Sequence, residues 1–190
     1  MYIPKQNLQK AFSDLEENVY AYRLPTWDEL PNFELYMEQV TAFIGQKLAF
    51  FNTASGSKLL TAAMVNNYVK LGYLPAPVKK KYNRVHLSCL LILCTLKQTL
   101  DIADIVCLLP NSADEAEAKT VYDSFVRNQK KAFAYVTENV KSVADPILTK
   151  ESDNQERMND LVMQVAVSAN LFKILGVSIT RGAKNHHTDG

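Results

Sequence analysis

The side chains with the clearest chemical potential form two neighbouring clusters near the middle of the chain. The first combines the amides of Asn66 and Asn67 with the amine of Lys70, at spacings that place them on one side of a helix. An amide side chain can pair bidentately with adenine in the major groove of DNA, and a lysine can contact guanine or phosphate. The second cluster, Lys79–Lys81 with Arg84, is cationic and suits phosphate groups. Together the clusters are typical of a surface that binds nucleic acid.

The first cluster needs a helix, and the sequence predicts one over residues 61–71. Thr61 is a suitable N-cap, and Gly72 is a plausible residue for the turn that ends the helix. Apolar side chains recur at helical spacing on the side that would face a core, namely Met64, Val65, Tyr68 and Leu71. The opposite side carries Ala63 together with the amides and Lys70, and it is small and polar enough to approach a ligand.

The second cluster lies on a loop over residues 75–82 and on the helix that follows. Pro75 and Pro77 hold the chain extended, because each disfavours the helical conformation of its predecessor. Tyr82 could stack on or hydrogen-bond to a sugar-phosphate, although packing beneath the loop is the commoner role for such a tyrosine. Asn83 can cap a nearly all-apolar helix over 84–99, in whose first turn His86 is expected to be a packed or capping residue.

The distribution of charge supports an anionic partner for this region. The chain has 190 residues and a net charge of only +1, but residues 39–100 contain eight Lys and Arg and no Asp or Glu. A local basic block inside a near-neutral protein indicates nucleic acid as the first candidate partner. A solvated surface that is balanced by acidic neighbours in space explains the same pattern equally well.

The sequence gives little support to catalysis, metal binding or a cofactor. Its six glycines form no phosphate-binding cluster, and no serine or cysteine sits in a recognisable nucleophile motif. Cys89, Cys94 and Cys107 match no common zinc spacing, and their apolar surroundings predict buried, reduced thiols in a cytoplasmic protein. The longest apolar run, 87–96, is too short to span a bilayer, so no membrane association is expected.

The rest of the chain also reads as helical. Capping boxes are expected at Thr26 with Glu29 and at Ser112 with Glu115. A break is expected at Asp145–Pro146. Besides the two helices described above, helices are predicted within 1–24 and over 33–51, 102–109, 113–142 and 154–175. The fold class is therefore all-α, with an N-terminal domain over 1–110, a helical segment over 111–180 and a flexible tail over 181–190.

The stretch from Thr61 to Leu109 resembles the DNA-binding module of the mercuric-resistance-regulator (MerR-like) family of transcription factors. The resemblance rests on Val65–Pro77, which ends in GYLPAP, on Lys81–Arg84, on His86-Leu87 and on Leu100–Ile105. Residues 24–150 are more closely similar to an uncharacterised bacterial family that is known only as a domain of unknown function. No biochemical activity accompanies the closer family, so the looser resemblance supplies the functional expectation.

The resemblance implies a MerR-like winged helix-turn-helix with a small basic wing and additional C-terminal helices. Helix 61–71 would enter the major groove of double-stranded DNA, and the 75–82 loop would be the wing. A homodimer built by the helices at 113–142 and 154–175 would follow, and these helices could also form an effector pocket, although no polar constellation marks one. The implied DNA-binding residues are Thr61, Ala63, Asn66, Asn67, Lys70, Lys79, Lys80, Lys81, Tyr82 and Arg84.

Two departures from the regulator pattern support an alternative. Asn66 stands where the family usually has a phosphate-binding arginine, and Asn67 replaces the first of its paired tyrosines. In addition, about ten residues, 52–61, separate the preceding helix from helix 61–71, where the family has a short turn. The alternative is a protein-interaction module that keeps the helix-turn-helix scaffold without binding DNA.

Overall fold

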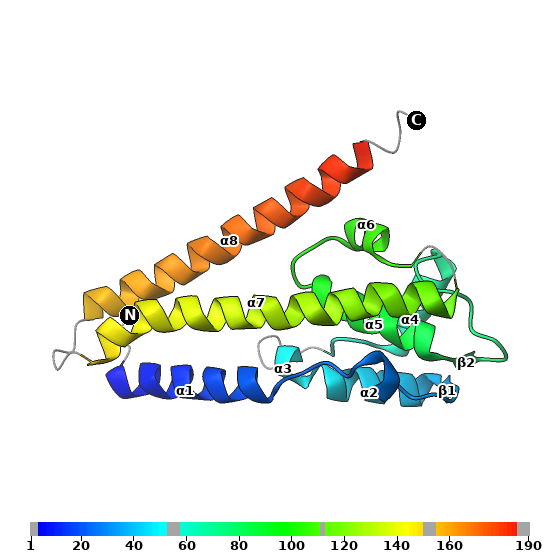
Figure 1. Cartoon of the computed structure of the whole chain (residues 1–190), viewed down its shortest axis with the longest axis horizontal. Helices are drawn as coiled ribbons and strands as arrows, with labels where there is room; N and C mark the ends of the chain where they lie inside the picture. Colours follow the sequence, from blue (N-terminus) through cyan, green and yellow to red (C-terminus); the bar gives the residue numbers. More distant parts are fainter. Residues whose placement is uncertain (1–3, 53–57, 111–112, 150–154, 186–190) are drawn as a thin grey trace. The chain divides into compact units, whose positions relative to one another are not determined.

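The computed structural model describes residues 4–52, 58–110, 113–149 and 155–185, which are almost entirely helical (Figure 1). Helix accounts for 74% of the chain and strand for 3%, which confirms the all-α prediction. The chain divides into two compact units. We call Leu24–Asn128 the central unit, and Met1–Arg23 together with Gln129–Gly190 the terminal unit. These bounds differ from the predicted division at residue 110.

The central unit contains most of the short elements. Along the chain these are η1 (Trp27–Glu29), β1 (Leu35–Tyr36), α2 (Met37–Lys47), α3 (Ala49–Asn52), α4 (Ala62–Lys70), β2 (Lys81–Tyr82), α5 (Arg84–Leu96), α6 (Ile102–Ile105) and η2 (Val106–Leu108). The N-terminal part of α7 (Glu115–Thr149) completes the unit.

The core of the central unit is built around α5. Asn83 caps this helix, because its side-chain oxygen accepts a hydrogen bond from the backbone N–H of His86 at 3.4 Å. Every residue from Val85 to Cys94 is buried, as expected for a helix that is apolar on all sides. Val40 and Ile44 of α2 are also fully buried, and α2 packs against α5. The predicted role of this helix as the buried centre is confirmed.

The N-terminal edge of the central unit is held by polar contacts as well as by packing. The backbone N–H of Thr26 donates to Glu29 Oε2 at 2.8 Å, so the predicted capping interaction is present. Trp27 is buried and meets the ring of Tyr122 from α7 edge-on, with 6.2 Å between ring centroids. The Tyr122 hydroxyl donates to the carbonyl of Pro25 at 2.8 Å. These contacts join the start of the unit to α7.

The predicted helix over 33–51 was wrong at its beginning and its end. Leu35 and Tyr36 form a short strand that pairs antiparallel with β2, with Leu35 opposite Tyr82 and Tyr36 opposite Lys81. Helix α2 therefore starts only at Met37, and it stops at Lys47 before the single turn of α3. The strand forms because a partner distant in sequence offers hydrogen bonds, which the helical spacing of apolar residues does not reveal.

The terminal unit consists of α1 (Lys5–Ala21), the part of α7 from Gln129 onward, and α8 (Gln155–Asn185). The ring of Tyr22, next to α1, lies 5.5 Å from that of Phe133 in α7. Tyr135 of α7 meets Phe172 of α8 edge-on, with 6.4 Å between centroids. The predicted N-terminal and C-terminal helices are therefore present.

Several predicted helix ends in α7 and α8 need correction. Asp114 begins α7, since its carboxylate accepts from the N–H of Glu117 at 2.9 Å; the predicted cap Ser112 lies outside the described residues. The expected break at Asp145–Pro146 is wrong, because α7 continues to Thr149. Proline near the end of a helix removes one backbone donor, and the last turn tolerates this.

Helix α8 is longer than predicted and its apolar side chains are largely exposed. It continues to Asn185, where the sequence predicted a tail from residue 181, because the terminal residues include helix formers such as Ala183 and Lys184. Residues 186–190 lie outside the described part of the chain. By length and composition, Glu156–Gly182 is apolar enough to cross a membrane, and none of its most apolar window is buried.

Candidate nucleic-acid interface

Helix α4 presents the first predicted cluster, and both of its ends are defined by local hydrogen bonds. The Thr61 hydroxyl accepts from the N–H of Met64 at 3.3 Å, which confirms the predicted N-cap. At the other end, Gly72 has a φ of +73°. The N–H of Tyr73 donates to the carbonyl of Tyr68 at 2.8 Å, and the N–H of Gly72 donates to the carbonyl of Val69 at 3.1 Å. This pair of bonds is a Schellman motif, in which glycine relieves the strain of the left-handed residue.

The two sides of α4 differ in exposure. Val65 and Tyr68 are buried against the rest of the unit. The opposite side is exposed and carries the predicted base-reading residues, namely Ala63, Asn66, Asn67 and Lys70. Within the described residues the amides of Asn66 and Asn67 make no side-chain hydrogen bond, so they are available to a ligand. Thr61 is half-buried and its hydroxyl is engaged in the cap, so it positions the helix.

The second cluster lies on a tight β-hairpin. The N–H of Lys81 donates to the carbonyl of Val78 at 2.9 Å, and these two residues form a bridge around a two-residue turn. Lys79 and Lys80 occupy the turn with φ values of 49° and 64°. Positive φ at both central residues is the pattern of a type I′ turn, which usually contains Asn and Gly. Both lysine side chains are exposed at the tip of this hairpin.

The hairpin is attached to the core through Tyr82. This side chain is only 3% exposed, and its ring meets the imidazole of His86 edge-on at 5.2 Å between centroids. His86 Nδ1 accepts from the backbone N–H of Asn83 at 3.1 Å, so the predicted packed and capping role of His86 is confirmed. Burial lowers the pKa of His86, although the nearby carbonyls of Pro75 and Ala76 partly oppose this effect. Tyr82 and His86 therefore support the hairpin from inside.

Lys81 and Arg84, unlike the turn lysines, are engaged by acidic or backbone partners. Lys81 Nζ lies 3.4 Å from a carboxylate oxygen of Glu34 and 5.8 Å from the centre of the Tyr36 ring. Arg84 Nε donates to the carbonyl of Leu30 at 3.2 Å, and its Nη1 lies 3.9 Å from Glu115 Oε1. Arg84 thus ties α5 to η1 and α7, while Lys81 stays partly exposed beside the hairpin.

Of the cations in the two clusters, Lys70, Lys79 and Lys80 have side chains that are exposed to solvent. Within the described residues these three lysines form no ion pair. In residues 39–100, which contain no Asp or Glu, the positive charges of Lys81 and Arg84 are therefore balanced by nearby carboxylates, and those at the hairpin turn and on α4 are not. This division could not be read from the chain, because Glu34 and Glu115 lie far from it in sequence.

Sequence reasoning overlooked apolar and aromatic side chains beside the hairpin. Phe33 and Tyr36 are 63% and 57% exposed, and Val78, which opens the turn, is 66% exposed. The register of β1 on β2 places Tyr36 directly opposite Lys81. No local signal in the sequence marks this group, because β1 pairs with a strand that lies far along the chain.

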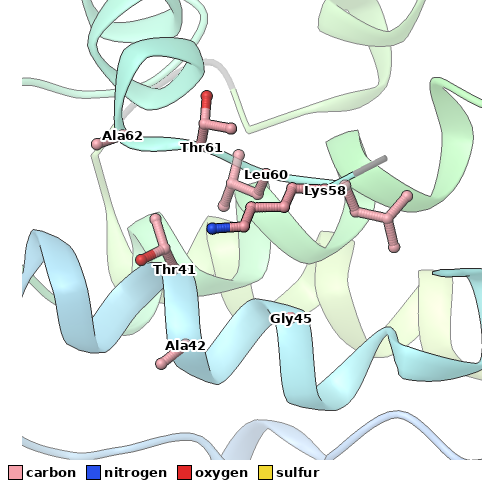
Figure 2. A pocket seen from close by; sticks show the side chains of 8 residues that line it. Thr41, Ala42, Gly45, Lys58, Leu60, Thr61 and Ala62 are labelled. Atoms are coloured by element: carbon pink, nitrogen blue, oxygen red, sulfur yellow. The ribbon is translucent and has the colours of Figure 1, made fainter. Parts of the chain in front are cut away.

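A pocket also opens between α2 and the N-terminal end of α4. Its volume is about 390 Å³, and it is lined by Thr41, Ala42, Gly45, Lys58, Leu59, Leu60, Thr61 and Ala62. In Figure 2 the side chain of Lys58 extends across this pocket, with Thr41 on one side and Thr61 on the other. An amine beside the positive end of a helix dipole favours an anionic group. Lys58 therefore adds a cation near the start of α4.

The cysteines and the acidic residues offer no competing site among the described residues. Burial raises the pKa of the thiols of Cys89 and Cys94 to about 11, which keeps them protonated and unreactive. Cys107 is exposed, so the prediction that all three thiols are buried was wrong for this residue, which lies at the outer side of η2. In the described ranges, no group of three or more His, Cys, Asp and Glu side chains could hold a metal ion.

The fold and the site define a small helical domain that presents an amide-bearing helix and a cationic hairpin. Comparison with protein families matches residues 25–125 to a domain of unknown function, DUF1836. The chain belongs to this family, which agrees with the similarity to an uncharacterised bacterial domain. No curated protein and no solved structure matches the chain.

Proposed function

We propose that this protein is a cytoplasmic DNA-binding transcriptional regulator of the MerR-like winged helix-turn-helix type. The exposed side of α4 enters the major groove of double-stranded DNA, where Asn66 and Asn67 contact bases and Lys70 contacts a base or phosphate. The hairpin lies on the sugar-phosphate backbone as a wing, with Lys79 and Lys80 contacting phosphates.

The observation that carries the proposal is the conformation of the hairpin turn. An Asn-Gly pair adopts the type I′ conformation without strain. Lys79 and Lys80 adopt the same left-handed backbone conformation with strain, which lowers the stability of the folded state. The turn therefore places at an exposed tip, at a cost in stability, two positive charges that form no ion pair with any residue the structure describes. Phosphate binding gives a reason for this exchange, because charge at the tip contributes directly to affinity.

The remaining predicted residues have supporting roles in this proposal. Arg84 and Tyr82 hold the hairpin and the start of α5 in place through their buried or partly buried contacts. Lys81 exchanges its contact with Glu34 for a phosphate when DNA binds. Lys58 and the N-terminal end of α4 accept a backbone phosphate in the pocket of Figure 2. Base recognition is left to Asn66 and Asn67.

Salt dependence provides the decisive experiment. Binding to a fluorescent duplex of random sequence is measured by anisotropy at a series of KCl concentrations. Each lysine–phosphate contact contributes a slope of about 0.9 in the plot of log K against log salt, so Lys79→Ala with Lys80→Ala should lower the slope by about two. The matched control is Lys130→Ala with Lys131→Ala, two exposed lysines of α7 outside the candidate interface.

The absence of detectable binding at low salt would reject DNA binding. An equal change of slope in the hairpin variant and the Lys130/Lys131 control would reject the hairpin as the site of phosphate contact. A second variant separates base recognition from phosphate contact. Asn66→Ala with Asn67→Ala should leave the slope of log K against log salt unchanged. On a duplex selected by the wild-type protein it should lower affinity by about tenfold or more, because the adenine contacts are lost.

The alternative of a protein-interaction module has its own structural support. Phe33, Tyr36, Leu71 and Val78 are large apolar side chains that are all more than half exposed in the central unit. Apolar and aromatic groups on a surface favour contact with protein. A stoichiometric protein partner in a pull-down, together with a purified sample whose 260/280 nm absorbance ratio shows no nucleic acid, would favour this function.

A further inference from the structure

Helix α8 exposes large apolar side chains along most of its length. Between Val162 and Ile179 it carries nine large apolar side chains that are each 47–63% exposed. Of the residues from Leu161 to Thr180, only these two end residues are buried. An apolar helix in the core of a water-soluble domain is covered on all sides, as α5 is. The apolar composition of α8 is therefore not explained by a place in a core.

The exposed side chains point in all directions around the axis of α8. At about 3.6 residues per turn, Val162, Leu171, Phe172 and Ile174 project in four directions, separated from one another by about 60–120°. Each of these four side chains is 49–61% exposed. A helix that packs on a protein surface is apolar on one side, whereas a helix that is apolar all round has to be surrounded. A single partner helix would leave much of this surface in water.

Helix α7 covers only part of one side of α8. The two helices line an open groove of about 300 Å³, where Leu161, Val165 and Phe172 of α8 lie opposite Tyr135 and Val136 of α7. Even on this side Val165 and Phe172 stay 47% and 56% exposed. Contact with α7 therefore does not bury α8, and within the described residues no other element surrounds it.

The length of the apolar segment matches the thickness of a lipid bilayer. The 20 residues from Leu161 to Thr180 extend over about 30 Å at 1.5 Å per residue, which equals the thickness of a hydrocarbon core of about 30 Å. Asp160 directly precedes this segment and Arg181 directly follows it, so charged groups lie where the hydrocarbon would end. Glu156–Gly182 meets the length and composition needed to cross a membrane.

The polar side chains of the segment are few. Lys173 is its one charged residue, and it lies seven residues before Thr180, so its long side chain can extend toward the lipid headgroups. The Thr180 hydroxyl donates to carbonyl oxygens of the preceding turn at 3.0 and 3.1 Å, which satisfies it without water. The amides of Gln164 and Asn170 oppose insertion, and ten Leu, Ile, Phe and Val residues of the segment favour it.

We propose that α8 is a membrane-spanning helix, which inserts Leu161–Thr180 into a lipid bilayer. Lipid surrounds the inserted helix and covers its apolar side chains in every direction, which a second copy of the chain on one side does not. Helix α8 leaves the groove on α7 when it inserts, because α7 carries the exposed charges of Lys130, Lys131 and Glu138 and stays in water. The inference does not depend on DNA binding.

Extraction from vesicles tests the proposal. The full chain is reconstituted from detergent into phosphatidylcholine vesicles, which are washed with alkaline carbonate to release surface-bound protein and then floated. The wild type should stay with the vesicles. Leu171→Lys with Leu175→Lys puts two charges into the segment and should lower the retained fraction by about tenfold or more.

A matched control adds the same charge elsewhere. Leu71→Lys with Leu108→Lys changes two side chains of the central unit that are 51% and 44% exposed, and it should be retained like the wild type. Uncharged lipid keeps attraction between lysine and anionic headgroups out of the comparison. Circular dichroism verifies that each variant is folded.

The reactivity of a cysteine placed on α8 reports insertion directly. Leu171→Cys is made together with Cys107→Ser, so that the remaining native thiols, Cys89 and Cys94, are buried. Position 171 is exposed in the absence of lipid, so a water-soluble maleimide should react readily there. In vesicles the rate should fall by about tenfold or more, because the thiol lies in hydrocarbon. The control, Leu108→Cys with Cys107→Ser, should react equally in both conditions.

Three results would overturn membrane insertion. They are release of the wild type by carbonate, equal labelling of the Leu171→Cys variant with and without vesicles, and protection of that thiol that needs no lipid and increases with protein concentration. The last would favour a second copy of the chain. A released chain that still binds DNA with the expected salt slope would reject only membrane insertion, whereas a retained chain without DNA binding would reject only the proposed function.

Discussion

Helices α5 and α8 both carry many large apolar side chains, but these side chains have opposite environments. In α5 every residue from Val85 to Cys94 is buried, because α2 and neighbouring elements of the central unit cover it. In α8 only Met158, Leu161 and Thr180 are buried among the side chains that the structure describes. An apolar helix therefore predicts that a partner is needed, but not whether the partner belongs to the same chain. The comparison separates an apolar helix that its own unit covers from one whose apolar side chains stay exposed.

The largest effect that tests this contrast is expected from shortening a leucine in each helix. Leu90 of α5 is fully buried, so Leu90→Ala should lower the free energy of unfolding by about 2–5 kcal/mol through lost burial and the cavity that remains. Leu171 of α8 is 61% exposed, so Leu171→Ala should change it by less than about 1 kcal/mol in dilute protein. Urea unfolding followed by circular dichroism measures both. Equal losses would mean that α8 is already covered within the monomer.

A smaller contrast is expected between two tyrosines of α7. The Tyr122 hydroxyl is buried and donates to the Pro25 carbonyl, so Tyr122→Phe removes a bond and leaves an acceptor unpaired. We expect this variant to lose about 1–2 kcal/mol of unfolding free energy. Tyr135 is 55% exposed, and Tyr135→Phe should lose less than about 0.5 kcal/mol. The same urea experiment compares them, and a greater loss at Tyr135 would reverse the contrast.

The pH dependence of stability tests how His86 supports the hairpin. Burial lowers the pKa of His86 in the folded state below its usual 6.5, so the unfolded chain binds a proton first as the pH falls. Stability from His86 is therefore complete above about pH 6.5 and decreases as the pH falls toward the folded-state pKa, with a slope of at most about 1.4 kcal/mol per pH unit. Urea midpoints between pH 5 and 8 measure it. His86→Gln should flatten this part of the profile, and an unchanged slope would contradict the assignment.

The sequence predicted those features whose causes are local. The caps at Thr61 and Asn83 and the glycine at 72 were found because each depends on residues within one or two turns. The burial of α5 was found because its composition leaves no polar side to face water. In these cases the chemistry of a short segment is sufficient to determine its structure.

The features that escaped prediction depend on distant partners. Strand β1 forms because Leu35 and Tyr36 pair with Tyr82 and Lys81 of β2, and the local sequence pattern does not predict that pairing. In the candidate interface, Arg84 was expected to face a ligand, but its contacts with Leu30 and Glu115 come from segments far along the chain. The exposure of α8 was also not predicted. An apolar composition indicates that a helix should be buried, but it does not show whether another part of the chain covers it.

The smallest effect sharpens the comparison between stability and function within the central unit. Replacing Lys79 with Asn and Lys80 with Gly gives the turn the residues that its left-handed backbone prefers. This double variant should therefore unfold at a higher urea concentration, with a gain of about 0.5–1 kcal/mol. It should also bind duplex DNA more weakly, with a salt slope lower by about two, because both tip charges are lost.

Opposite signs in the two measurements are what distinguish a functional turn from a structural one. If the lysines served only to form the hairpin, the Asn-Gly variant would be more stable and would bind DNA as well as the wild type does. Lys79→Ala with Lys80→Ala provides the companion measurement, since it removes the same charges while keeping a strained backbone. Equal DNA binding by these two variants, at different stabilities, would show that charge at the tip, and not the ease of forming the turn, controls affinity.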